Sequence, residues 1–132
     1  MKSKTLGQVI RAADGLKPNS FTEEQKTAWM NTLEGRIQTD IWLRSFAEVT
    51  LYNAETDMDA ELLVMPPHDD IYSAWLLAQI DFANGEYDKY HNSMAMYNEL
   101  WGNYLRWFAG NYAPAQGYNT NIPRPVPEDW NW

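Results

Sequence analysis

The feature that most constrains the fold is a periodic row of large apolar side chains late in the chain. Between residues 87 and 109 they recur at spacings of four and three residues, which places them on one face of an α-helix. Residues 70–83 repeat this periodicity, and Asn84-Gly85 supplies the conformations that end a helix. The two segments therefore predict an antiparallel helical hairpin. The row consists of Tyr90, Met94, Tyr97, Trp101, Tyr104 and Phe108.

Two further helices are expected before this hairpin. Apolar residues recur at helical spacing over residues 4–15 and again from about residue 20 to residue 45. Together the four segments predict an all-α, four-helix domain over residues 1–109. We expect the core to contain Trp29, Leu33, Ile37, Ile41, Trp75, Phe82, Met94, Tyr97 and Trp101.

Residues 46–67 have no helical period and are rich in acids. The sequence allows either a long loop or a short β-hairpin between Val49–Tyr52 and Leu62–Val64. We expect this segment to project from the helical core, with its acids facing a neighbouring subunit or a channel. The acids in question are Glu55, Asp57, Asp59 and Glu61.

Charge is unevenly distributed along the chain. Residues 1–44 carry seven Lys or Arg and five acids, whereas residues 45–88 carry ten acids and no Lys or Arg. The whole chain has a net charge of −8, which argues against binding a nucleic-acid backbone. A solvated acidic face is the simplest interpretation, and a subunit with oppositely charged sides is the more specific one.

Residues 110–132 differ from the rest in composition. They contain four prolines, no apolar period and two terminal tryptophans, which predicts an extended segment rather than a packed one. Tryptophan is enriched at binding hot spots, so we expect this segment to bind a partner. The residues expected to bind are Pro123, Arg124, Pro125, Val126, Pro127, Trp130 and Trp132.

Residue types that carry chemistry are few. The chain has no cysteine, which excludes disulfides and thiolate sites. His68-Asp69-Asp70 could bind a metal, but acids that open a helix after Pro66-Pro67 explain the same residues. We therefore predict that the chain is not an enzyme, has no catalytic residues and needs no metal or other cofactor. A small hydrolase that uses the acidic segment is the weakest alternative.

No stretch of the sequence approaches the roughly 18 consecutive apolar residues of a membrane span. Residues 1–15 also lack the apolar run of a signal peptide. We expect synthesis in the cytoplasm and no membrane partner.

Four segments resemble the head–tail connector (adaptor) proteins of long-tailed bacteriophages and prophages. They are residues 19–26 leading into Trp29, residues 67–72, residues 79–86 and residues 92–98. Together they span most of residues 18–110, and none of them is a catalytic signature.

The resemblance implies a virion structural protein at the head–tail interface. Such a subunit would form a ring of about twelve copies beneath the portal protein. The ring would extend the channel through which DNA passes without specific binding, and would contact the next neck or tail-completion protein. The alternative from another class is a monomeric helical-hairpin module that binds other proteins through its aromatic row.

Overall fold

A computed structural model describes residues 3–111 of the chain. The chain divides into two compact units, residues 1–102 and residues 103–132. The boundary lies inside the last helix, and each unit is described by itself. In the second unit, successive turns of the helix bring the Tyr104 ring to 5.9 Å from Trp107 and 6.0 Å from Phe108, measured between ring centroids.

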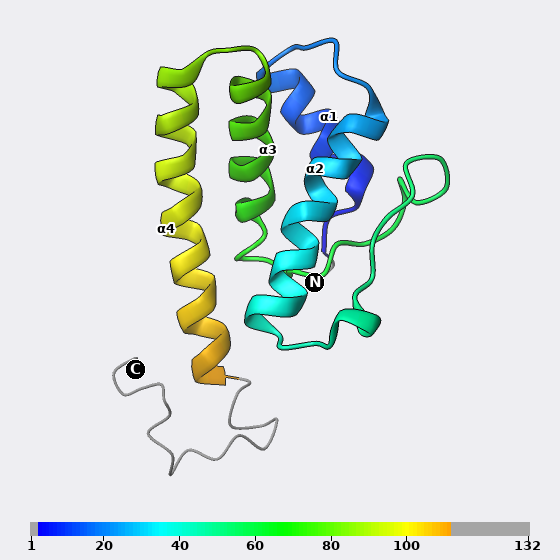
Figure 1. Cartoon of the computed structure of the whole chain (residues 1–132), viewed down its shortest axis with the longest axis vertical. Helices are drawn as coiled ribbons and strands as arrows, with labels where there is room; N and C mark the ends of the chain where they lie inside the picture. The colour runs from blue at the N-terminus through cyan, green and yellow to red at the C-terminus, as the bar shows by residue number, and fades with distance from the viewer. Residues whose placement is uncertain (1–2, 112–132) are drawn as a thin grey trace. The chain divides into compact units, whose positions relative to one another are not determined.

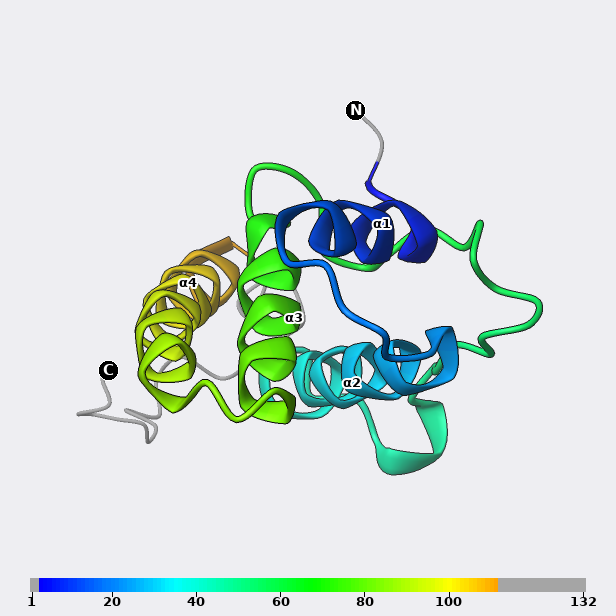
Figure 2. The same cartoon turned by 90° about the horizontal axis from the view of Figure 1, so that it is seen from above.

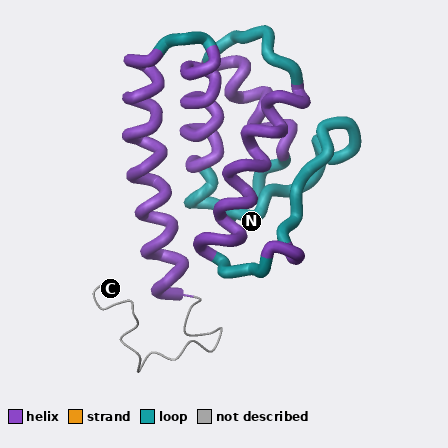
Figure 3. The backbone as a smooth tube through the Cα atoms, viewed as in Figure 1, coloured by secondary structure: helices purple, strands orange, loops and turns teal. Residues whose placement is uncertain are grey.

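The predicted all-α fold is confirmed for the described residues, which contain four α-helices and no strand (Figure 1). The α-helix predicted to reach residue 45 ends at Arg36. The π-helical turn η1 continues it to residue 41, and the short turn η2 follows later in the chain. Of the two possibilities for residues 46–67, the structure has the loop (Figure 3). The elements are α1 (Leu6–Leu16), α2 (Glu23–Arg36), η1 (Ile37–Ile41, π-helical), η2 (Phe46–Glu48, 3-10), α3 (Asp70–Ala83) and α4 (Tyr87–Asn111).

The first two helices begin at residues that the sequence equips for capping. The Thr5 hydroxyl accepts the backbone N–H of Gln8, whose side chain accepts the N–H of Thr5. Thr22 and Gln25 make the same reciprocal pair at the start of α2. Each pair satisfies two donors that a helix start otherwise leaves free.

The core of the first unit lies among α1, α2 and α3, and α3 has the first part of α4 on its other side (Figure 2). The apolar rows of α1 and α3 meet α2 there. The deepest apolar side chains are Leu6, Val9, Ile10, Met30, Leu33, Ile37, Ile71, Leu76 and Ile80.

The predicted core is confirmed in part. Leu33, Ile37, Ile41, Trp75 and Tyr97 are buried. The assignment of Phe82 was wrong, because this ring lies in the last turn of α3 and is 52% exposed. It packs instead against two tyrosines of α4 at the end of the hairpin. The remaining three, Trp29, Met94 and Trp101, are half-buried.

The expectation that residues 46–67 stay outside the core was wrong at the C-terminal end of the segment. Leu62 and Val64 are 2% and 1% exposed. The reason is that two apolar residues spaced by two along an extended chain point to the same side, here the interior. The loop therefore closes one side of the core.

The loop also completes the start of α1. The N–H groups of Leu6 and Gly7 donate to the carbonyls of Ala60 and Met58, at 3.0 and 2.8 Å. Leu62 N–H donates in turn to the carbonyl of Lys4. A Cβ on Gly7 would lie 3.0 Å from the Met58 oxygen, so this close approach requires glycine.

Candidate functional site

A row of three polar residues, two on α2 and one on η1, which continues α2, holds the loop against the helical core. Asn31, Glu34 and Gln38 are spaced by three and four residues and so share one face of the helix. Glu34 and Gln38 are both 0% exposed, although such residues rarely lie inside without partners. Their partners are backbone and tyrosine groups of the loop and of α3.

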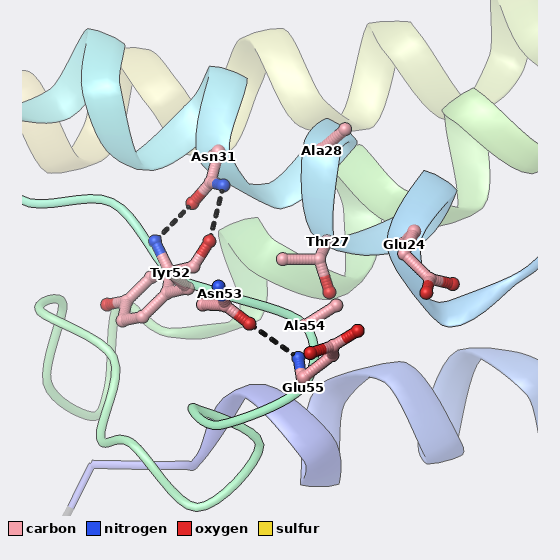
Figure 4. A pocket seen from close by; sticks show the side chains of 8 residues that line it. All are labelled: Glu24, Thr27, Ala28, Asn31, Tyr52, Asn53, Ala54 and Glu55. Atoms are coloured by element: carbon pink, nitrogen blue, oxygen red, sulfur yellow. Dashed lines mark hydrogen bonds between the residues drawn. The ribbon is translucent and has the colours of Figure 1, made fainter.

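The two amide side chains bind the loop as a neighbouring strand would. Asn31 Nδ2 donates to the carbonyl of Tyr52 and its Oδ1 accepts the N–H of the same residue, at 3.0 and 2.8 Å (Figure 4). Gln38 does the same with Thr50, at 2.8 and 2.9 Å. Arg44 donates a further bond of 2.7 Å to the Gln38 amide oxygen. Residues 50 and 52 thereby satisfy their backbone without any strand partner.

Glu34 lies between these amides and receives three hydrogen bonds. The hydroxyls of Tyr72 and Tyr52 donate to its two carboxyl oxygens at 2.7 and 2.5 Å, and Leu63 N–H donates at 3.0 Å. The Tyr72 hydroxyl accepts the N–H of Val64 at 2.8 Å. One carboxyl group thus joins α2, α3 and both ends of the loop.

Burial changes the proton affinities in this cluster. Desolvation raises the pKa of Glu34, although the three donors oppose the shift. Desolvation and the Glu34 carboxylate raise the pKa values of Tyr52 and Tyr72 well above that of a free phenol. The phenols therefore remain hydrogen-bond donors throughout the neutral range.

The four loop acids named from the sequence are not gathered into one site. Asp57 accepts the N–H of Asn53 at 2.7 Å and shapes the loop, and Glu61 accepts the Ser3 hydroxyl at 3.3 Å. Glu55 and Asp59 are exposed, with no side-chain hydrogen bond or ion pair among the described residues.

A shallow groove of about 380 Å³ runs between the N-terminal half of α2 and the loop (Figure 4). We call it the acidic groove, because carboxylates from both of its walls line it. Its floor includes Thr27, which is 3% exposed. The lining residues are Glu24, Thr27, Ala28, Asn31, Tyr52, Asn53, Ala54 and Glu55.

The His68-Asp69-Asp70 segment serves the start of α3. Asp70 is the first residue of that helix, and Asp69 is buried with an ion pair of 3.8 Å to Lys4. Within residues 3–111, no group of three His, Cys, Asp or Glu side chains is placed to hold a metal ion. The helix-opening interpretation accounts for this geometry.

A buried ion pair ties the end of α1 to the hairpin. The Asp81 carboxyl group is 0% exposed and accepts bonds from Lys17 and from the Ser93 hydroxyl, the latter at 3.0 Å. Both bonds reach the same oxygen of the Asp81 carboxyl group. The second oxygen of that group has no hydrogen-bond partner in the described part of the chain. Removing either donor would leave a buried charge less compensated.

The predicted partner-binding residues Pro123–Pro127, Trp130 and Trp132 lie outside the described residues. Sequence reasoning missed Asn31, Glu34 and Gln38. The sequence did contain a signal for them. Met30, Glu34 and Gln38 recur every four residues, in the row next to the predicted apolar row of the second helix. Polar residues at such positions lie on the buried face of the helix.

No helix in the described part of the chain is both long and apolar enough to cross a membrane. Comparison with protein-family models, with curated proteins and with solved structures found no match for this chain.

Proposed function

We propose that this chain is a virion structural protein, a head–tail connector subunit that assembles into a ring below the portal. The ring would extend the DNA channel and join the head to the neck or tail. The proposed partners are further copies of the chain, the portal protein and the next neck component. Its proposed location is the head–tail interface of the virion, after synthesis in the cytoplasm of the host bacterium.

The observation that carries the proposal is the separation of charge along a small helical unit. Residues 45–88 hold ten acids and no Lys or Arg, and several of the acids are exposed without a cation partner in the described part of the chain. Residues 1–44 hold most of the cations. Rings use heterologous contacts, in which two different surfaces meet, and opposite charge on those surfaces favours that arrangement.

The four connector-like segments support the same proposal, and in the fold they serve structural roles. Residues 19–26 contain the α2 capping pair, residues 67–72 open α3, and residues 79–86 end it. Residues 92–98 carry Tyr97, which packs on Trp75 with ring centroids 5.0 Å apart.

The test is assembly of the purified chain, alone and with the portal protein of the same genome. Electron microscopy should show rings, and their central opening should coincide with the portal axis in the mixed sample. A chain that neither self-associates nor binds the portal ring would refute the proposal.

A second candidate, a protein-interaction module built on the helical hairpin, is favoured by one observation. Phe82 and Tyr87 are 52% and 56% exposed and lie with Tyr90 in a cluster at the end of the hairpin, with ring centroids 5.0 to 5.6 Å from Phe82. Such a module would stay monomeric and would not bind the portal ring, so sedimentation of the chain, alone and mixed with the portal ring, separates the two candidates.

A further inference from the structure

The acidic groove holds uncompensated negative charge. Glu24 comes from the first turn of α2 and Glu55 from the loop, and neither carboxylate has a cation partner among residues 3–111. Two carboxylates that line one small groove repel each other unless a cation lies between them. The groove therefore favours a positively charged occupant.

Thr27 gives an independent indication of a ligand. Its side chain lies under the groove between α2 and the loop (Figure 4), and its hydroxyl oxygen has no hydrogen-bond partner in the described part of the chain. A buried hydroxyl without a partner costs free energy, which a donor reaching the groove floor would recover. The required occupant thus carries both positive charge and several N–H donors. A guanidinium group has five such donors in a planar fork.

Among the residues that the structure describes, one arginine is available for this role. Within residues 3–111, Arg11 of α1 has no hydrogen bond, ion pair or ring contact, and it is exposed. The other described cations are engaged: Lys4, Lys17, Lys26 and Lys89 in ion pairs, Arg44 and Arg106 in hydrogen bonds, and Arg36 over the Trp75 ring. Arg11 does not occupy the groove of its own chain, so the contact needs a second copy.

We propose that the acidic groove of one copy binds the Arg11 guanidinium of a second copy. This inference rests on the proposed self-assembly and names one of its contacts. Glu24 and Glu55 accept from the guanidinium, and the Thr27 hydroxyl accepts a further N–H as the loop adjusts. The contact pairs two different surfaces, so each copy can bind one neighbour through its groove and a second neighbour through its Arg11.

The test is a charge exchange followed by sedimentation velocity at low ionic strength. Arg11→Glu and the double variant Glu24→Lys/Glu55→Lys should each weaken self-association at least about tenfold, as loss of a close charge pair does. The triple variant, with all three charges reversed, should restore it. Lys89→Glu and Glu99→Lys are matched controls on the exposed surface of α4 and should leave self-association unchanged.

Mixing the variants tests the geometry. Arg11→Glu keeps its groove and the double variant keeps its arginine, and the reversed residue 11 of the first also matches the reversed groove of the second. An equimolar mixture should therefore recover the self-association that each variant lacks alone. Thermal unfolding should show all variants folded. Oligomers that form normally in both variants, or a triple variant that fails to recover, would overturn this contact and leave the ring proposal standing. A parent chain that is monomeric at every concentration also overturns the contact, and binding to the portal ring then decides the proposed function separately.

Discussion

The Tyr72 hydroxyl donates to a carboxyl oxygen of Glu34 at 2.7 Å, across 38 positions of sequence, and accepts the N–H of Val64 at 2.8 Å. This one oxygen connects α3, α2 and the end of the loop. Because Tyr72 and Glu34 are both fully buried, water cannot replace either bond.

Tyr72→Phe should therefore destabilise the chain while preserving its shape. The change leaves the Val64 N–H and a Glu34 oxygen buried without partners, at a cost of about 1–3 kcal/mol. Urea unfolding followed by circular dichroism measures the loss. Tyr90→Phe is the control, because Tyr90 is only half-buried, and it should change the unfolding free energy by less than about 0.5 kcal/mol. Equal effects of the two changes would contradict the role given to Tyr72.

The raised pKa of Glu34 predicts a pH dependence of stability. The folded chain holds this proton more tightly than the unfolded chain, whose carboxyl has its ordinary pKa of 4.5. The stabilisation is therefore fully present below pH 4.5 and is lost as the pH rises through the folded pKa. The unfolding free energy of the parent and that of Glu34→Gln should be measured between pH 4 and pH 8. As the pH rises, the parent should lose stability relative to the variant, which has no carboxyl group to titrate. A constant difference would show that Glu34 titrates normally.

Trp75 and Trp101 should differ in their contribution to stability. Trp75 is 6% exposed and its indole N–H donates to the carbonyl of Trp29 at 2.7 Å, whereas Trp101 is half-buried. Truncation to alanine should cost about 3–5 kcal/mol at Trp75. At Trp101 we expect about 1–3 kcal/mol. Thermal unfolding compares the two, and a larger loss at Trp101 would show that the burial order is reversed.

Charge reversal at two neighbouring acids of the loop should affect folding and assembly differently. Asp59→Lys changes an exposed side chain without a described contact, so stability should stay within about 0.5 kcal/mol while ring assembly weakens. Asp57→Lys removes the acceptor of the Asn53 N–H and should destabilise the loop by about 1 kcal/mol as well. Chemical unfolding and particle counts in electron micrographs measure the two effects. Unchanged assembly in both variants would remove the loop acids from the proposed interface.

Deletion of residues 112–132 tests the proposed role of the C-terminal segment. The fold of residues 3–111 should persist, because its core residues all precede the deletion. Incorporation into the portal complex should be lost together with Trp130 and Trp132, since aromatic residues of this kind dominate binding energy. Co-sedimentation with the portal ring measures incorporation. Replacing only the two tryptophans with alanine is the narrower variant, and normal incorporation of both variants would rule out the segment as an attachment site.

The helices could be predicted because their periodicity is local. The spacing from Tyr90 to Trp101 and the Asn84-Gly85 break define the hairpin without knowledge of the rest. The path of residues 46–67 could not be predicted, because its hydrogen bonds go to side chains of α2 and η1 and to the backbone around the start of α1. Those partners lie up to 58 positions away, as for the N–H of Leu62 and the carbonyl of Lys4. The acidic groove was missed for the same reason, since Glu24 and Glu55 meet only after the loop folds back.

The attachment of the loop to α1 has a consequence for synthesis. α1 is translated before the loop, yet its leading N–H groups are satisfied by the loop carbonyls of Met58 and Ala60. A ribosome must therefore translate beyond residue 60, and expose that stretch outside its tunnel, before the N-terminal helix has all of its partners. In nascent chains arrested before residue 60 has left the tunnel, these amides should exchange freely with solvent. In chains arrested after that point, the same amides should be protected from exchange.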